Sequence, residues 1–417
     1  MIPTTTKCYI EALGCAGNRA DAVKVMECLN NAGYTFTDKP DDAGMVVVMT
    51  CAFSKTHEQF SGQRITALGQ SIRNGQKLVV GGCLPKINSN FANGNGLKID
   101  FQFDPRNIES FARYIDGNLS SRMFQVEDGV GLVRVSTGCA GACTYCSIRF
   151  ATGSVQSRSL EQIQADIKSL QEQGVRKIRL VSEEVGAWGH DIGSNVAHLL
   201  RFVLDIGPDL DIYTEGINPR WYLEHLRGAD DLLKETRWKG PLYLPVQSGS
   251  TRILDLMCRG YNRLDIDAVL DEIAAVCPWR GVSTDLMVGF PSESEEDFLE
   301  TRALLTERDF SSLQLFVYQA RPGIKSEKIE PKITEEEKLS RLTRLLLVIL
   351  DKELEKRNTD FASLMQDIVN GAVGLPVNVN VGVGNNAEGG MLGELNLCDF
   401  CKRWHSTETA QLAPAAM

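Results

Sequence analysis

The residues with the clearest chemical pattern are three cysteines near the middle of the chain, in the segment Gly138-Cys139-Ala-Gly-Ala-Cys143-Thr-Tyr145-Cys146. Three thiolates at this spacing can bind three irons of a cubane [4Fe–4S] cluster, and the fourth iron then keeps an open position for a small ligand. A structural zinc ion would need a fourth protein ligand nearby, and no histidine lies within forty residues of the segment. The pattern therefore favours an iron–sulfur site over zinc and over three unrelated cysteines. We call Cys139, Cys143 and Cys146 the loop trio.

A second set of three cysteines lies in the first quarter of the chain, and each follows an apolar stretch typical of a buried strand. They occur in the strings Leu13-Gly14-Cys15-x-x-Asn18-x-x-Asp21, Met49-Thr50-Cys51 and Gly81-Gly82-Cys83-Leu84-Pro85. Since parallel strands present their carboxyl ends at the same edge of a sheet, the three thiols could converge there. The alternative is three unrelated buried cysteines, because cysteine is often a small core residue. We call Cys15, Cys51 and Cys83 the strand-end trio.

Residues 1–120 alternate strand and helix signals, which is typical of an α/β domain with a parallel sheet. Cys8–Leu13 alternates like a short strand, and Met45–Met49 and Leu78–Val80 are apolar runs typical of buried parallel strands. Ala20–Ala32 has the spacing of an amphipathic helix. We therefore predict a self-contained N-terminal α/β domain.

Residues 129–335 repeat the alternation of strand and helix with a longer period. Six strands are predicted, at Leu132–Ser136, Lys177–Val181, Asp211–Glu215, Leu242–Val246, Val282–Val288 and Leu313–Val317. Helical patterns such as Leu160–Gln173 and Leu264–Val276 separate them. The pattern predicts a partial (β/α)6 barrel whose functional loops gather at the carboxyl ends of the strands. A helical extension at residues 336–370 and a small C-terminal segment at residues 371–417 should follow.

The 417-residue chain has the composition of a soluble globular protein, with 43% hydrophobic and 24% charged residues. Its net charge of −10 gives no general attraction to phosphate, so a nucleic-acid site would need a local basic patch. Twelve cysteines point to metal or redox chemistry, because a reducing compartment disfavours disulfides. No apolar run is long enough to span a membrane, and the N-terminus does not resemble a secretory signal. We therefore expect a cytoplasmic protein with no membrane partner.

The loop trio, with an aromatic residue before its third cysteine and a predicted β/α barrel around it, resembles the radical S-adenosylmethionine (SAM) superfamily. Glu183 and Glu184 follow the second barrel strand, where such enzymes place polar residues for the SAM amino group. The string Val288-Gly-Phe-Pro-Ser-Glu293 follows the fifth strand and resembles the segment that contacts adenine. The resemblance implies SAM contacts at these four residues and at Tyr145.

Longer strings resemble one branch of the superfamily, the methylthiotransferases, over roughly residues 7–350. These strings are Leu244–Ser250, Met257–Tyr261, Asp285–Pro291, Glu296–Phe298 and Arg321–Gly323. Gln247, in the first string, is a candidate for the active site and for SAM binding. The strand-end trio occurs where this family carries three N-terminal cysteines, so the resemblance implies that it holds an auxiliary [4Fe–4S] cluster.

The resemblance implies an enzyme with two [4Fe–4S] clusters that uses SAM both as methyl donor and as radical source. One SAM would methylate a sulfur on the auxiliary cluster. A second SAM would be cleaved at the loop trio, and the resulting 5′-deoxyadenosyl radical would take a hydrogen from the substrate, which then receives the methylthio group. A flavodoxin- or ferredoxin-type protein is the expected electron donor. A non-catalytic Fe–S sulfur carrier is the alternative from another class, and it would not cleave SAM.

The substrate of such an enzyme is either an adenosine in tRNA or an aspartate in a ribosomal protein, and both kinds of enzyme normally end in a TRAM domain. Residues 371–417 are too short and too rich in Gly and Asn to resemble that domain. Thr152 and Ser154 replace two arginines of the family pattern, and the acid at Glu184 is closer to the Asp of protein-modifying members than to the Asn of tRNA-modifying ones. We therefore expect a peptide or protein substrate, for example an Asp of a ribosomally synthesised and modified peptide, recognised by residues 371–417. Methylthiolation of a modified adenosine in tRNA is the alternative.

The C-terminal segment carries Cys398-Asp-Phe-Cys401-x-x-x-His405, which resembles half of a zinc site. Only three ligands are present in it. A structural metal is one interpretation, and cysteines of a flexible or simply packed tail are the favoured one.

Overall fold

The structure is a computed structural model that describes residues 7–73, 75–91, 97–119, 122–370, 377–380 and 395–396. It divides into two compact units. Unit 1 comprises Met1–Tyr243 with Asp271–Arg280, and unit 2 comprises Leu244–Leu270 with Gly281–Met417. Unit 1 thus contains the predicted N-terminal domain together with the first strands of the predicted barrel. The boundaries predicted from the sequence remain predictions.

The first sheet of unit 1 is parallel throughout and has the strand order β2-β1-β3-β4-β5. Its strands are β1 (Lys7–Ala12), β2 (Thr35–Phe36), β3 (Met45–Thr50), β4 (Lys77–Gly82) and β5 (Phe101–Gln102). Every residue of β3 is buried, as expected for the central strand of a sheet covered on both faces. This sheet confirms the predicted N-terminal parallel α/β architecture.

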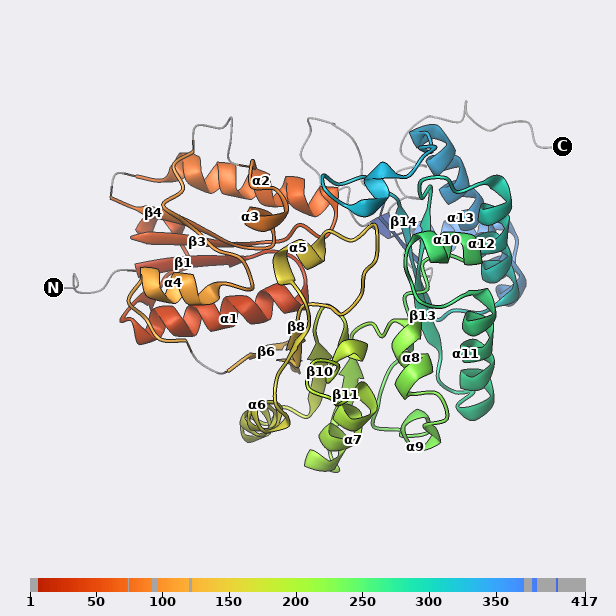
Figure 1. Cartoon of the computed structure of the whole chain (residues 1–417), viewed down its shortest axis with the longest axis horizontal. Helices are drawn as coiled ribbons and strands as arrows, with labels where there is room; N and C mark the ends of the chain where they lie inside the picture. Colours follow the sequence, from red (N-terminus) through yellow and green to blue (C-terminus); the bar gives the residue numbers. More distant parts are fainter. Residues whose placement is uncertain are drawn as a thin grey trace. The chain divides into compact units, whose positions relative to one another are not determined.

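Helices cover both faces of this sheet, as Figure 1 shows. On one face lie α1 (Ala16–Asn31) and α4 (Ile108–Tyr114), whose Val25, Leu29 and Phe111 pack against Val47 of β3. On the other face lie α2 (Lys55–Ser71) and α3 (Leu84–Ile87), whose apolar residues pack with alternate residues of β3 and β4. The alternation of the strand side chains therefore supplies two separate cores, one for each helix layer.

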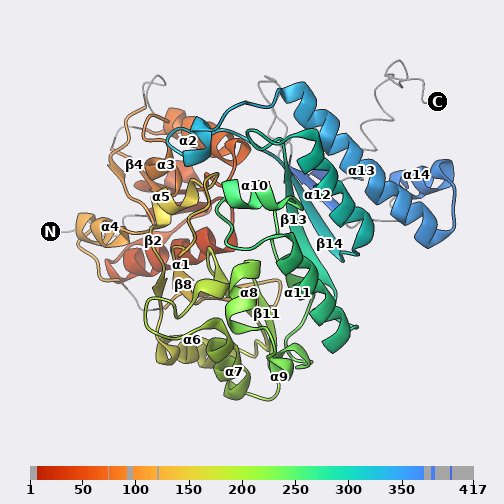
Figure 2. The same cartoon turned by 45° about the vertical axis from the view of Figure 1, so that its right-hand side comes forward.

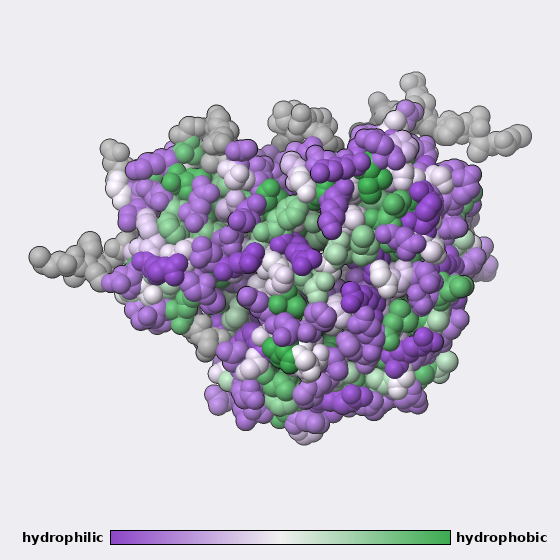
Figure 3. Space-filling view, in the orientation of Figure 1, coloured by the Kyte–Doolittle hydropathy of each residue, from purple (hydrophilic) through white to green (hydrophobic). Residues whose placement is uncertain are grey.

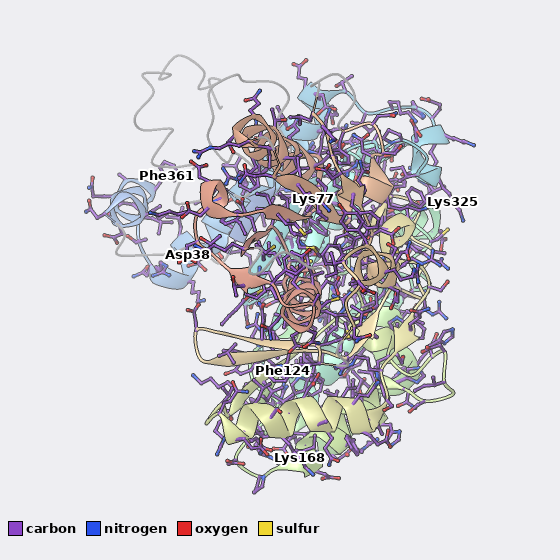
Figure 4. The ribbon with its side chains drawn as sticks, turned by 90° about the vertical axis from the view of Figure 1, so that its left-hand side faces the viewer. Asp38, Lys77, Phe124, Lys168, Lys325 and Phe361 are labelled. Carbon is purple, nitrogen blue, oxygen red and sulfur yellow. The ribbon has the colours of Figure 1, made fainter. Side chains whose placement is uncertain are left out.

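The second sheet of unit 1 has the order β11-β10-β7-β6. Its strands β7 (Val130–Arg134), β10 (Lys177–Val181) and β11 (Asp211–Thr214) are parallel, whereas β6 (Phe124–Glu127) pairs antiparallel with β7. The helices that follow these strands are α6 (Leu160–Glu172) and α7 (Val196–Ile206). Figure 4 shows α6 with the exposed Lys168 on its outer side, and it labels Phe124 on β6. Ile163, Ile167 and Leu170 on the other side of α6 are fully buried.

Unit 2 is built on the parallel strands β13 (Val282–Val288), β14 (Ser312–Val317) and β15 (Val377–Asn380), and β16 (Leu395–Asn396) pairs antiparallel with β15. Helices α12 (Glu295–Glu307) and α13 (Glu335–Arg357) pack together beside these strands (Figure 2). The remaining elements are η1 (Pro40–Asp42), β8 (Ser136–Thr137), α5 (Ile148–Thr152), β9 (Gln156–Ser157), η2 (Val185–Ala187), α8 (Pro219–His225), α9 (Asp230–Leu233), β12 (Leu242–Tyr243), α10 (Thr251–Leu256), α11 (Arg263–Val276), η3 (Lys325–Lys328) and α14 (Phe361–Val369). All six strands predicted for the barrel are therefore present, and the α/β class is confirmed.

None of the described helices is both long and apolar enough to cross a bilayer. On the face drawn in Figure 3, hydrophobic residues are scattered among hydrophilic ones. Isolated surface hydrophobes of this kind are normal for folded proteins and need no partner.

Candidate functional site

The strand-end trio lies along one edge of the first sheet. Cys15 follows β1 as the N-cap residue of α1, Cys51 directly follows β3, and Cys83 directly follows β4. Because β1, β3 and β4 are adjacent and parallel, their carboxyl ends bring the three thiols to the same edge. Burial raises the pKa of the Cys83 thiol well above its ordinary value, and the neighbouring Cys15 and Cys51 raise it further. The sheet thus creates the convergence that the sequence pattern allowed.

Side chains that are not sulfur ligands hold these strand ends in place. Asn18, in the first turn of α1, donates from Nδ2 to the carbonyl of Leu13 and, at 3.1 Å, to the carbonyl of Met49. This one amide therefore ties the end of β1 to the end of β3. Ser61 of α2 bonds both backbone groups of Cys51, since Ser61 Oγ donates to Cys51 O at 2.8 Å and accepts from Cys51 N at 3.1 Å.

A glycine permits the close contact between the loop before Cys15 and Cys51. Gly14 has φ +91°, and a Cβ added to it would lie 2.3 Å from Cys51 Cβ and 2.6 Å from Cys51 Sγ. Any other residue would collide with the thiol and would also be strained by the positive φ. The loop before Cys15 consequently packs directly against Cys51.

The loop trio occupies the segment between β8 and α5, beyond the carboxyl end of β7. Gly138 opens the loop with φ +81°, where a Cβ would lie 2.2 Å from the carbonyl oxygen of Ser154. The N–H of Gly141 donates to Cys139 Sγ at 3.2 Å, which is the type of contact that stabilises a bound thiolate. Burial, followed by the nearby Glu184 carboxylate, raises the pKa of Cys139 to about 12. Metal binding at this thiol must therefore displace a proton.

Both trios fit [4Fe–4S] clusters by the chemistry of their donors. The ten cysteines in the described part of the chain form no disulfides. Among these described residues, no three His, Cys, Asp or Glu side chains lie close enough together to share one metal ion. A cubane cluster does not need such a group, because it spreads its three cysteine ligands over three different irons. Thiols without histidine, in glycine-lined loops, suit iron–sulfur chemistry better than a single hard cation.

The predicted SAM contacts of unit 1 lie next to the loop trio and have additional structural roles. Glu183 Oε2 accepts from Gly138 N at 2.8 Å, so it anchors the start of the loop. Glu184 Oε1 accepts from Gly186 N at 3.1 Å and from Asn218 N at 3.0 Å, and Glu184 is buried. Tyr145, within the loop, is half-buried. Contact of Glu183, Glu184 and Tyr145 with SAM remains a prediction.

The predicted SAM contacts of unit 2 lie on β13 and on the segments around it. Gln247 has φ +75° and donates from Nε2 to Asp285 Oδ2 at 3.3 Å. Val288 is the last residue of β13 and is buried. Glu293 is 2% exposed, and its Oε2 accepts from Arg341 Nη1 at 2.7 Å. These contacts shape the segment after β13, and the role of Gln247, Val288 and Glu293 toward SAM remains a prediction.

One buried charge cluster beside the trios was not predicted from the sequence. Arg134, at the end of β7, has no exposed surface and forms ion pairs with Glu183 at 2.6 Å and with Asp21 of α1 at 3.7 Å. The signal that could have revealed it is an arginine inside an otherwise apolar strand, because buried arginines require acidic partners. Asn18 could not have been recognised in this way, since its role depends on where two other strands end.

The candidate metal ligands near the C-terminus, Cys398, Cys401 and His405, lie outside the residues that the structure describes. So does most of the segment 371–417 that was expected to recognise the substrate.

Protein-family models and solved structures identify the fold class of this chain. The model of the Radical SAM superfamily matches residues 133–305, and that of the Uncharacterized protein family UPF0004 matches residues 7–103. The radical S-adenosylmethionine methyltransferase TsrM from Kitasatospora setae has a similar fold, with a TM-score of 0.55 and 13% identity over 78% of this chain and 77% of that one. The cobalamin-dependent S-adenosylmethionine radical enzyme OxsB gives a TM-score of 0.53 with 11% identity over 82% of this chain and 56% of that one. The fold is thus that of radical SAM enzymes.

Relatives that are similar in sequence show which family of radical SAM enzymes the chain belongs to. The chain is 30% identical over 374 residues to the tRNA-2-methylthio-N(6)-dimethylallyladenosine synthase of Burkholderia ambifaria, covering 83% of this chain and 81% of the relative. It is 31% identical over 374 residues to the protein of the same name in Paraburkholderia phytofirmans, with the same coverage. The chain therefore belongs to the radical SAM methylthiotransferase family. This confirms the predicted resemblance, the enzyme class, and SAM and [4Fe–4S] clusters as the cofactors.

Proposed function

We propose that this enzyme transfers a methylthio group to a modified adenosine in tRNA, the alternative of the sequence analysis. The observation that carries the proposal is the similarity, over 83% of the chain, to relatives named for this reaction on N6-dimethylallyladenosine. The peptide substrate favoured by the sequence analysis becomes the second candidate. Its support is the presence of Thr152 and Ser154 where the family pattern has arginines.

In this proposal, the strand-end trio and the loop trio each hold one cluster. When bound, the clusters and SAM supply the sulfur, the methyl group and the electron-driven cleavage of SAM. The chain contributes rigid positioning: Asn18 and Ser61 fix the strand ends, and Glu183 fixes the first peptide of the loop.

Two exposed arginines supply local positive charge beside the loop trio, in spite of the acidic net charge. Arg149 Nη2 lies 3.5 Å from Ser154 Oγ, and Arg149 Nη1 donates to Gly141 O at 2.7 Å. Arg106, after β5, packs on Gly153, where a Cβ would lie 2.6 Å from Arg106 Nε. We infer that these two guanidinium groups contact the tRNA backbone and replace the arginines missing at 152 and 154.

The direct test gives the reconstituted enzyme, SAM and reductant a mixture of tRNA that carries N6-dimethylallyladenosine and total small-subunit ribosomal protein. Mass spectrometry of nucleosides and of peptides then shows which substrate gains the methylthio group. The proposal expects the gain on adenosine alone. A gain on a peptide with unmodified tRNA would contradict it and support the second candidate.

The inferred tRNA contacts are tested by the double variant Arg106→Gln/Arg149→Gln. We expect tRNA binding to weaken. The slope of log affinity against log salt concentration should become shallower by roughly one to two units, because a protein that makes fewer phosphate contacts releases fewer counterions from the RNA. Arg73→Gln is the matched control, since Arg73 is exposed and pairs with Asp41 beyond the far end of α2. Equal salt slopes for the wild type, the double variant and the control would contradict the inferred contacts.

A further inference from the structure

Arg134 lies at the centre of the buried charge cluster that includes Asp21 and Glu183. It ends β7, the strand that leads into the loop trio, and it pairs with Asp21 of α1, the helix that begins after Cys15. Its other partner, Glu183, accepts from Arg134 Nη2 at 2.6 Å and from the Gly138 peptide at 2.8 Å. The guanidinium therefore connects the N-terminal turn of α1 with the start of the cysteine loop.

One nitrogen of this guanidinium is not satisfied. Arg134 Nη1 is buried and has no hydrogen-bond partner among the described residues. It points at the first turn of α1, because a Cβ added to Gly17 would lie 2.4 Å from it. A buried unpaired N–H of a charged group is costly, so its retention calls for a partner that the polypeptide alone does not supply.

The groups around Arg134 indicate which cluster would supply the missing hydrogen-bond acceptor for Nη1. Arg134 Nη1 faces Gly17, two residues after Cys15, and the same guanidinium pairs with Asp21 one turn further along α1. Two carboxylates and three ionised cysteines would leave this buried edge strongly negative without the arginine, and a low dielectric makes such an imbalance expensive.

We propose that Arg134 is a positioning residue that balances the charge of the auxiliary cluster and raises its reduction potential, with Nη1 as the donor on the Cys15 side. This inference rests on the proposed assignment of the strand-end trio to that cluster. Reduction adds a negative charge to the cluster, and a fixed buried cation stabilises the reduced form more than the oxidised form. Removal of the cation should therefore lower the potential.

The experiment uses the full chain with the loop trio changed to alanine, so that only the strand-end trio can bind a cluster. The midpoint potential is measured by an EPR-monitored redox titration, together with the iron content. Arg134→Gln should keep about four irons per chain and shift the potential downward, and Arg134→Lys should restore part of the shift. Arg280→Gln is the matched control and should leave the potential unchanged. Arg280 is also buried and also has guanidinium nitrogens with no partner among the described residues, but it donates to Glu235 O at 2.8 Å and not to a group around Arg134.

Asp21→Asn supplies a test that does not depend on Arg134→Gln holding its cluster. Loss of a nearby negative charge should move the potential upward. In a second chain, the strand-end trio is changed to alanine so that only the loop trio can bind a cluster. There, Arg134→Gln should shift the midpoint potential by a smaller amount. About four irons per chain with an unchanged potential in both Arg134→Gln and Asp21→Asn would overturn the role of Arg134 and leave the cluster assignment standing. Absence of iron from the strand-end trio of the otherwise unchanged chain would overturn the cluster assignment and this inference with it.

Discussion

Single residues decide how closely the cysteine-bearing loops of unit 1 can pack. Gly14 allows its loop to rest on Cys51, and Gly138 allows the loop trio to turn against Ser154. The Cys83 and Cys139 thiols are protonated in the absence of metal, since burial raises the pKa of both. The neighbours that lower the energy of ionised sulfur, such as the Gly141 peptide, are therefore as important to the site as the cysteines.

Replacement of Gly14 by alanine tests this packing. We expect Gly14→Ala to lose the strand-end cluster, about half of the bound iron, because the new Cβ occupies the position of the Cys51 side chain. Iron content after anaerobic reconstitution measures the effect. Gly33→Ala is the matched control, since Gly33 also has a positive φ, +85°, but nothing within 4 Å of an added Cβ.

Both variants carry the backbone strain of an L-residue at positive φ, about 1–2 kcal/mol. A difference between them in iron content therefore reports the collision with Cys51 and not the strain. Full iron content in Gly14→Ala would show that the loop before Cys15 does not constrain the cluster.

At the scale of elements, the sequence alone predicted the bounds of strands that are short, apolar and central in a sheet. Lys177–Val181 and Val282–Val288 were predicted to the residue, because β-branched and apolar residues pack on a sheet that is covered on both sides. The strands before Cys15, Cys51 and Cys83 were predicted with bounds one or two residues off, so the position of these cysteines at one edge of the sheet was predictable. Their binding of iron–sulfur clusters remains a prediction.

Elements whose ends are set by tertiary contacts were less predictable. The first helix begins at Ala16 and not at Ala20, because Gly17 and Asn18 are poor helix formers whose places are fixed by Arg134 and by the strand ends. The strand predicted at Leu242–Val246 stops at Tyr243, since Pro245 has no N–H to donate. The apolar pattern alone also does not predict β6, although the turn Asp128-Gly129 is a strong hairpin signal.

The first turn of α12 in unit 2 is held by Asp297, and this contact makes a testable prediction about the stability of the helix. Asp297 accepts from Ser294 N at 2.8 Å in a capping box, from Ser250 Oγ at 2.7 Å and from Arg252 Nε at 3.1 Å. These groups lower the pKa of Asp297 against the opposing effect of its burial. Asp297→Asn should destabilise this end of α12 by about 2–3 kcal/mol. Hydrogen exchange of the α12 amides should then be roughly 30- to 150-fold faster.

The control for this prediction is Glu295→Gln, two residues earlier in the same first turn of α12. Glu295 pairs with Arg344, but both side chains are substantially exposed, so its loss should cost less than about 1 kcal/mol. Equal exchange rates in the two variants would mean that the buried acceptor does not hold the helix start.

At the scale of the whole molecule, two properties could not be obtained from the sequence. The first is the substrate, because the charge and the residues at 152, 154 and 184 favoured a peptide, whereas the relatives that match most of the chain are named for tRNA. Two arginines brought to the loop trio from separate segments supply positive charge that composition does not reveal. The second is the division into units, in which residues 271–280 join unit 1 although their sequence neighbours belong to unit 2.

The central claim is that one chain holds two iron–sulfur clusters on two separate sets of three cysteines. The most direct measurement is the iron and sulfide content of the anaerobically reconstituted enzyme and of two variants, one with the strand-end trio and one with the loop trio changed to alanine. We expect about eight irons per chain in the wild type and about four in each variant. About four irons in the wild type, unchanged when the strand-end trio is removed, would contradict the claim and remove the auxiliary cluster from the mechanism.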